Sequence, residues 1–335
     1  MKDWLKLVAI LCASGILCSV ISHGAIRWFG IRSGHSGYQP YGKEGLKPKA
    51  VLYSSSLGYD GIDWQQVSEV LNGTIESWAT AGSSPSEWES DDRRSQGVTH
   101  AFIAVSPYDL NEYWLCDVRA EVVPLGKTIR DLQASGVDWE LCKRTLKQYP
   151  QMVVRKLFPT VGRSDGVMVG IRAKLQQITS GSKNPYVDDT PKLGAAGESK
   201  VTLKVTDWSP GQLQRRMLLM RESCEGKHSF NGPKAFALRR LLQRATRRGE
   251  VTMVVMPVSP FYRKEFLSPS VREEFEEALV KLQTEYPQIR LVRLDRISAL
   301  DDNNMYGDLV HLNMYGEKIA TAAFLDGIKA RKVSQ

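Results

Sequence analysis

The stretch Val51-Leu52-Tyr53-Ser54-Ser55-Ser56-Leu57 joins a short apolar segment to a run of three serines. Residues 58–63, with two glycines, follow it, and the apolar spacing from Trp64 to Leu71 predicts a helix. A strand, a tight turn and a helix in this order are the setting in which an α/β fold presents a nucleophilic hydroxyl at the carboxyl end of a strand. Because a serine is inert until a base removes its proton, the stretch also predicts a base elsewhere in the chain.

The best candidate for that base is His311, in the segment Asp308-Leu309-Val310-His311. Asp308 precedes it by three residues, a spacing that places both side chains on one face of a helical turn. In a loop, the same spacing lets the carboxylate fold back onto the imidazole. Either arrangement allows the aspartate to orient the ring and to stabilise its protonated form. The alternative interpretation is a surface pair that only caps the helix expected at 314–330.

Further apolar segments predict the other strands of the sheet. They lie at 75–79, 99–105, 251–256 and 289–294. Helical patterns follow the last two, at 271–286 and 314–330. Strands that alternate with helices indicate a parallel sheet covered on both faces, which is the three-layer α/β/α class.

The alternation weakens between residues 116 and 231, which we interpret as a largely helical insertion. The helical patterns in and just after it lie at 138–148, 166–178, 212–222 and 233–248. Residues 180–200 are rich in Gly, Ser, Pro and Lys and are expected to form a loop. The helix at 233–248 carries five arginines, and we expect its basic face to be solvated: Arg239, Arg240, Arg244, Arg247 and Arg248.

The N-terminal residues are apolar enough to suggest a membrane anchor. Between Leu5 and Ile21 only Lys6 is charged, and a helix from Trp4 to about Trp28 would cross a hydrocarbon core of about 30 Å. A cleaved signal peptide and a buried helix are the alternatives, and positive charges on both sides of the segment leave its orientation open. We therefore expect a transmembrane signal anchor at 1–30, a linker at 31–48 and one α/β domain at 49–330.

The chain has 335 residues and a formal net charge of +8. The excess of Lys and Arg favours anionic partners such as lipid head groups, acidic polymers or nucleic acid, but no nucleic-acid-binding motif accompanies it. The five histidines are scattered and the five cysteines have no metal-binding spacing, so we expect neither a metal site nor a cofactor. Whether Cys116 and Cys142 form a disulfide is left open.

The serine turn and the Asp308–His311 segment together resemble the SGNH/GDSL hydrolase superfamily. Residues 52–63 are similar to the first sequence block of that family, Ala81-Gly82-Ser83-Ser84-Pro85 to the second and residues 308–313 to the fifth. The layout with an N-terminal anchor resembles a membrane-anchored branch that includes the teichoic acid D-alanyl transfer protein and the alginate O-acetylation proteins. The resemblance covers residues 50–106 and 251–329 and does not extend to the insertion.

This resemblance implies roles for individual residues. Ser56 matches the family nucleophile, with Ser55 as the second choice, and Ser54 stands where the family usually has glycine. His311 matches the base, and Asp308 matches the acid that orients it.

The resemblance also implies donors for the oxyanion of a tetrahedral intermediate. The backbone N–H of Ser56 and that of Gly82 or Ser83 would face it. The family's Gly-x-Asn-Asp block is missing after the third strand, where Ser106 and Asn111 are the candidates for a further donor.

The implied function is acyl transfer or ester hydrolysis on an extracytoplasmic polysaccharide, through an acyl-serine intermediate. The implied partners are the lipid bilayer, the polysaccharide substrate and a membrane-bound O-acyltransferase that supplies the acyl group, with no nucleic acid. The globular domain is expected on the extracytoplasmic (periplasmic) side of the membrane. The rival hypothesis is a catalytically silent member that binds polysaccharide or docks an envelope assembly.

Overall fold

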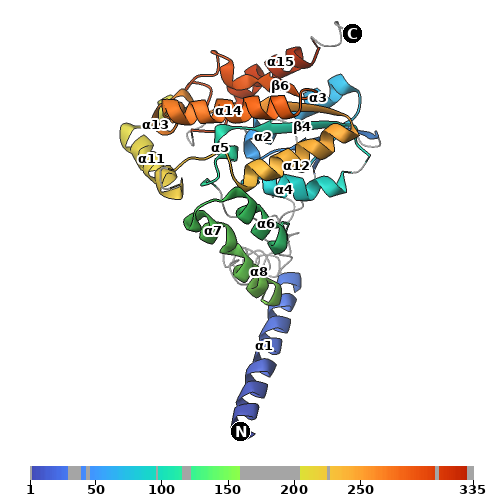
Figure 1. Ribbon diagram of the computed structural model, residues 1–335, viewed down its shortest axis with the longest axis vertical. Helices are drawn as coiled ribbons and strands as arrows, with labels where there is room; N and C mark the ends of the chain where they lie inside the picture. Colours follow the sequence, from blue (N-terminus) through green and yellow to red (C-terminus); the bar gives the residue numbers. More distant parts are fainter. Residues whose placement is uncertain are drawn as a thin grey trace, which may run out of the picture. The chain divides into compact units, whose positions relative to one another are not determined.

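The computed structural model describes residues 2–28, 39–42, 46–95, 97–114, 122–158, 204–224, 227–305 and 309–329. The described elements belong to two compact units. One contains α1 (Lys2–Trp28) and α8 (Gln148–Leu157). The other contains the sheet and the remaining elements drawn in Figure 1.

The second unit is built on a six-stranded sheet with the order β1-β3-β2-β4-β5-β6. Its strands are β1 (Gln39–Tyr41), β2 (Pro48–Tyr53), β3 (Thr74–Ser77), β4 (His100–Val105), β5 (Glu250–Val255) and β6 (Arg290–Arg293). Five strands run parallel, and β1 pairs with β3 in the antiparallel direction. The predicted α/β class with a parallel sheet is therefore confirmed. The serine run follows β2, which lies between β3 and β4 near the middle of the sheet.

Helices cover both faces of the sheet, because the central strands bury side chains on both sides. One core contains Leu52 and Phe102 from the strands, and α2 (Ser56–Gly61), α3 (Trp64–Leu71) and α15 (Met314–Lys329) pack into it. The opposite core contains Val51 and Ile103, under α4 (Pro85–Asp91), α12 (Pro233–Arg248) and α14 (Pro269–Glu285). Figure 1 shows α15 and α12 on opposite sides of the strands, in agreement with a three-layer α/β/α arrangement.

A cluster of aromatic rings supports the first of these faces. Trp64 lies with its ring centre 5.3 Å from that of Phe102 and 5.5 Å from that of Phe324. Its indole N–H also donates to the main-chain oxygen of Gly58 at 2.9 Å. Contacts of this kind fix α2, α3 and α15 against β4, and so place the start of α2 and the segment before α15 on the same side of the sheet.

The remaining helices of the second unit lie at the carboxyl ends of the strands and in the insertion. They are α5 (Pro107–Leu110), α6 (Leu125–Ser135), α7 (Trp139–Leu146), α11 (Pro210–Cys224) and α13 (Pro260–Phe266). Three short 3₁₀ turns accompany them: η1 (Asp92–Arg94), η2 (Val205–Asp207) and η3 (Leu294–Arg296). The described part of the insertion is largely helical, as expected. The helix and loop predicted at 166–178 and 180–200 lie outside the described residues.

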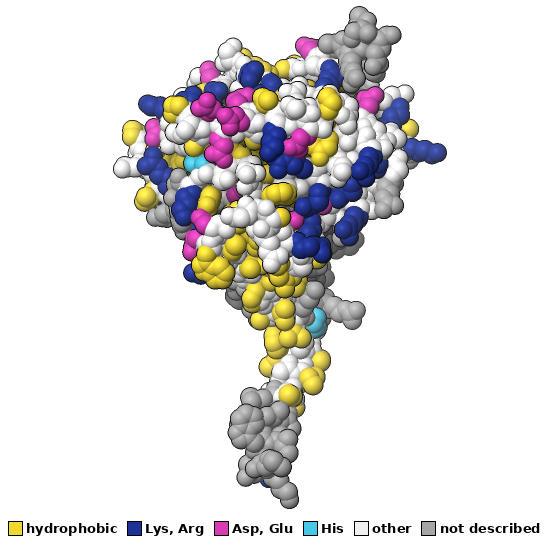
Figure 2. Space-filling view, viewed as in Figure 1, with side chains coloured by type: hydrophobic (Ala, Val, Ile, Leu, Met, Phe, Trp, Pro, Cys, Tyr) yellow, Lys and Arg dark blue, Asp and Glu magenta, His cyan; other side chains and the backbone are white. Residues whose placement is uncertain are grey.

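The basic face of α12 is not simply solvated, and that prediction was wrong for four of its five arginines. Arg239 pairs with Glu285 at 3.2 Å. Arg240 donates to both carboxylate oxygens of Glu89 at 2.9 Å, Arg244 donates to Asp92 at 2.7 Å, and Arg248 also pairs with Asp92. Burial alone would raise the pKa of Glu89, but hydrogen bonds from Arg240 and Lys127 lower it to about 2. Figure 2 shows Lys and Arg side chains gathered over α12. The carboxylates of Glu89 and Asp92, which pair with the other three arginines, are buried beneath them.

Two predictions fall on the N-terminal part of the chain. Residues 39–41, inside the predicted linker, form β1, because this short segment satisfies its backbone hydrogen bonds along the edge of β3. The predicted anchor falls on the continuous helix α1. Within the described ranges, no helix has both the length and the apolar character that crossing a bilayer requires. Among the described cysteines, Cys12, Cys18 and Cys142 are free, and Cys116 lies outside these ranges.

Candidate active site

Ser56 is the first residue of α2 and follows β2 after two buried serines. Ser55 adopts an extended conformation as the N-cap, and its hydroxyl accepts from the Leu57 N–H at 3.2 Å. The side chain of Ser54 is fully buried, and its hydroxyl donates to the Ser55 main-chain oxygen at 2.7 Å. Of the three serines, Ser56 alone is partly exposed and so within reach of a substrate.

Two glycines allow α2 to lie flat on the sheet and thereby fix the position of Ser56. A Cβ on Gly58 would overlap the Ser54 hydroxyl and the Ala104 side chain, and one on Gly61 would come within 2.5 Å of Met256 Cε. Interiors are close-packed and leave no room for such a methyl group. These glycines therefore act through close approach to neighbouring side chains.

His311 reaches Ser56 across 255 residues of sequence, with Nε2 2.7 Å from the Ser56 hydroxyl oxygen. The segment that carries it is held by main-chain bonds: the Leu309 oxygen accepts from the Ser259 N–H at 3.1 Å, and Asn313 N–H donates to Asn304 at 3.0 Å. Leu309 has a positive φ of 74°, which costs a non-glycine residue about 1–2 kcal/mol. Its fully buried side chain offsets this strain.

Asp308, predicted to orient His311, lies outside the described residues, so its role stays a prediction. The described residues also contain no group of three or more His, Cys, Asp or Glu side chains arranged to hold a metal ion.

The turn at residues 80–83 is tied to the serine segment. Both the Thr80 N–H and the Ser83 hydroxyl donate to the Ser54 main-chain oxygen, at 3.2 and 2.9 Å. The Ser83 N–H is already used within the turn, where it donates to the Thr80 oxygen at 2.9 Å. Gly82 adopts the left-handed conformation, with φ of 68°, that glycine accommodates without strain. Two N–H groups in this turn were predicted to face the oxyanion. That of Ser83 is used within the turn, which leaves that of Gly82 as the better candidate.

Ser106 and Asn111, the other predicted donors, make hydrogen bonds elsewhere in the described part of the chain. Ser106 caps α5: its hydroxyl donates to the Asp109 carboxylate at 2.8 Å and accepts from the Asp109 N–H at 3.1 Å. The Asn111 amide donates to the Lys227 main-chain oxygen and accepts from the Ser229 N–H, each at 3.2 Å. No described contact joins either side chain to Ser56.

Asp109 is a residue near the site that the sequence did not identify. It follows β4, and only 2% of it is exposed. Burial raises its pKa to about 6, although hydrogen bonds from Ser55 and Ser106 and the charge of His311 act in the opposite direction. Its contact with Ser55 places a titratable carboxyl behind the serine turn. The signal available in the sequence was its position four residues after the end of a strand and three residues after Ser106.

A scan against protein-family models gave no match, and a search of curated proteins found no similar sequence. Membership of the SGNH/GDSL superfamily therefore remains a prediction from the sequence motifs. The geometry itself provides a partly exposed hydroxyl in hydrogen-bond contact with an imidazole, at the start of a helix. This combination of groups is suited to nucleophilic catalysis on an acyl group.

Proposed function

We propose that this protein is an acyltransferase or esterase that works through an acyl-Ser56 intermediate, with an SGNH-type arrangement of its site. The observation that carries the proposal is the distance of 2.7 Å between His311 Nε2 and the Ser56 hydroxyl oxygen. Ser56 and His311 come from segments that the fold has to bring together, and Ser56 is the exposed member of the serine run.

In the proposed first step, His311 Nε2 accepts the hydroxyl proton as Ser56 attacks the carbonyl carbon of an ester. The negative charge then develops on the carbonyl oxygen. The N–H groups of Ser56 and Gly82 are the donors suited to stabilise it, because N–H groups at the start of a helix and in a turn are preorganised. When the intermediate collapses, the alcohol leaves with the proton from His311, and the acyl group stays on Ser56.

In the second step, His311 deprotonates an incoming hydroxyl that attacks the acyl-serine. Water gives hydrolysis, and a sugar hydroxyl gives transfer. We propose a polysaccharide as the carbohydrate partner on the basis of the family resemblance. The net charge of +8 suits an acidic polymer.

We further propose that residues 1–30 anchor the protein, with the globular domain on the extracytoplasmic (periplasmic) side and a membrane-bound O-acyltransferase as donor of the acyl group. Carbonate extraction of membranes and protease treatment of intact cells test this location. Release by carbonate would contradict the anchor, and protection of the domain in spheroplasts would contradict its orientation.

A serine-reactive fluorophosphonate probe followed by intact-protein mass spectrometry tests the chemistry. The wild-type chain should gain one adduct, which Ser56→Ala should lose and the buried control Ser54→Ala should keep. Loss of the adduct in Ser55→Ala, with the adduct kept in Ser56→Ala, would move the nucleophile by one residue. A folded protein without any adduct would favour the silent scaffold that binds polysaccharide.

A further inference from the structure

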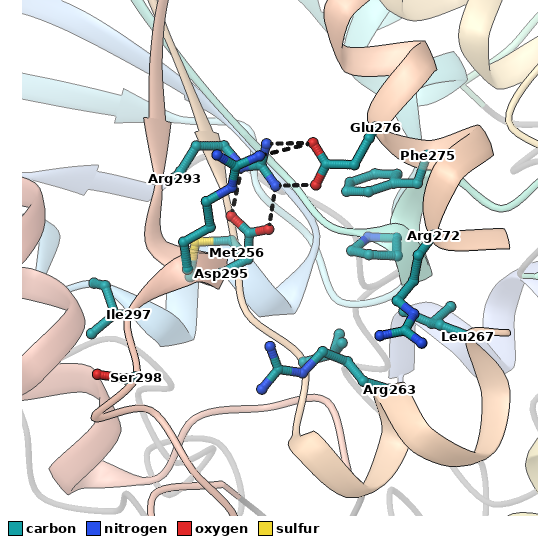
Figure 3. Close-up of a pocket in the computed structure, with 13 residues that line it drawn as sticks. Met256, Arg263, Leu267, Arg272, Phe275, Glu276, Arg293, Asp295, Ile297 and Ser298 are labelled. Atoms are coloured by element: carbon teal, nitrogen blue, oxygen red, sulfur yellow. Dashed lines mark hydrogen bonds and ion pairs between the residues drawn. The ribbon is translucent and has the colours of Figure 1, made fainter. Parts of the chain in front are cut away.

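A cavity of about 350 Å³ lies at the carboxyl ends of β5 and β6, between α13, α14 and η3. Its volume is at the lower end of the range of about 300–1,000 Å³ that is typical of small-ligand sites. Part of its wall is apolar, formed by Met256, Val258, Leu267 and Phe275. Figure 3 shows charged side chains around the rest of it.

Four arginines and two acidic residues line this cavity, which leaves an excess of two positive charges (four minus two). Arg293 uses its guanidinium on both acids: it donates to Glu276 at 2.7 Å and to Asp295 at 2.8 Å. Arg296 also donates to Glu276, at 3.2 Å. These two arginines and two acids therefore neutralise one another on one side of the cavity.

The excess charge belongs to Arg263 on α13 and Arg272 on α14. Among the described residues, neither guanidinium has a carboxylate or hydrogen-bond partner, and Figure 3 draws no interaction for either. Both lie on the side of the cavity away from the Arg293–Glu276 pair. Two unpaired guanidinium groups on one cavity repel each other, and each presents a planar fork of donors that matches a carboxylate or a phosphate. The arrangement is therefore complementary to an oxyanion.

The cavity lies at the same edge of the sheet as Ser56 and His311. Met256, in its wall, lies against Gly61 of α2, the helix that begins with Ser56. One residue beyond Val258, the Ser259 N–H donates to the main-chain oxygen of Leu309, two residues before His311. A polymer bound across this edge would meet both the cavity and the serine.

We propose that this cavity binds the anionic group, a carboxylate or a phosphate, of an acidic sugar unit in the polymer on which Ser56 acts. The apolar wall would contact the ring of that unit, and Arg263 and Arg272 would hold its charge. The proposal rests on the function proposed above for its choice of polymer. It assigns the cavity and the two arginines, Arg263 and Arg272, that would select an acidic unit of that polymer.

Calorimetry on the full chain carrying Ser56→Ala tests the proposal, because that protein binds without turnover. The probes are a uronic acid oligosaccharide, a phosphate-bearing oligosaccharide, a neutral oligosaccharide of the same length and inorganic phosphate. At least one acidic oligosaccharide should bind about tenfold or more tightly than the neutral one, and binding should weaken as salt is raised. The two acidic probes distinguish a carboxylate from a phosphate ligand. Equal binding of the acidic and neutral oligosaccharides would overturn the proposal.

Arg263→Gln and Arg272→Gln should each weaken acidic-oligosaccharide binding about tenfold, and the double variant should approach the neutral oligosaccharide. Lys264→Gln is the matched control, since this exposed neighbour on α13 does not line the cavity and should leave binding unchanged. Melting temperatures of all variants should match the parent, because neither arginine has a described partner to lose. Unchanged binding in the folded double variant would overturn the proposal.

The outcome can be separated from that of the proposed function. If the wild-type protein is labelled by the fluorophosphonate but the Ser56→Ala protein binds no acidic oligosaccharide, the anion site is overturned and the serine chemistry stands. Arginine-dependent binding without labelling would support the anion site and overturn the serine chemistry.

Discussion

Replacing Gly58 with alanine should displace α2 and with it the candidate nucleophile. The added Cβ would overlap the Ser54 hydroxyl and the Ala104 side chain, and would come within 2.9 Å of Ser54 Cβ. Ala104 belongs to β4 in the middle of the sheet and is fully buried, so it has little freedom to move. Ser54 is held by its own hydrogen bond to the Ser55 oxygen. We therefore expect α2 to shift, since it is a short helix at the edge of the site.

Two opposing contributions set the size of the effect on stability. Overpacking of a close-packed core costs about 1–3 kcal/mol. Alanine is better than glycine in a helix by about 0.5–1 kcal/mol, which offsets part of that cost. The free energy of unfolding should therefore fall by about 0–2.5 kcal/mol. The effect on chemistry should be larger, because a displacement of about 1 Å in a catalytic group can cost about a hundredfold in rate.

The assay compares urea unfolding with fluorophosphonate labelling rates on the same preparations. Gly126→Ala in α6 is the matched control, because a Cβ there meets nothing within 4 Å. It should leave labelling unchanged and stabilise the protein by about 0.4–1 kcal/mol. Wild-type labelling and stability in Gly58→Ala would refute the argument that close packing of α2 positions Ser56.

Three further predictions concern the groups behind the site. His311→Ala should lower probe labelling and ester turnover by about 10²–10⁴-fold with little change in melting temperature, and near-normal turnover in the folded variant would sink the mechanism. Because burial raises the pKa of Asp109 to about 6, its stabilising contribution is complete below the unfolded pKa and is lost as the pH rises through about 6. Above pH 7, the free energy of unfolding of Asp109→Asn should therefore exceed that of wild type by up to about 3 kcal/mol, and the difference should vanish below about pH 3; a difference independent of pH would contradict this. Burial raises the pKa of Glu112 to about 7, and the charge of Lys234 acts in the opposite direction. Lys234→Met removes that charge and leaves the buried main-chain oxygens of Asn111 and Trp114 without their donor, so it should lower the free energy of unfolding in urea by about 3–5 kcal/mol; an equal loss for the exposed control Lys281→Met would contradict it.

Some features could be predicted because the signal is local. The run of apolar residues from Val51 marked β2, and the amphipathic spacing from Trp64 marked α3 with the bounds that the structure has. The pairing of a serine turn with a distant histidine also followed from chemistry, since a nucleophilic serine requires a base. Asp308 could be proposed from its spacing to His311 alone.

Other features depend on contacts between segments far apart in the sequence. The arginines of α12 looked like a solvated face, because nothing local shows that Glu89 and Asp92 are buried beneath them. The sequence also could not show that Arg263 and Arg272 line one cavity, because the cavity forms only when α13, α14 and the segment after β6 pack together.

The sequence by itself determined the alternation of strands and helices, and hence the α/β class, because hydrophobic periodicity is a local property of the chain. Only the tertiary structure decided which of the three serines faces outward. Ser54 and Ser55 become buried when α2 packs through Gly58 onto β4, and Ser56 is left partly exposed, with its hydroxyl oxygen 2.7 Å from His311 Nε2. The physical reason is that exposure and distance depend on packing between β2, β4 and the segment before α15, which no short stretch of sequence encodes.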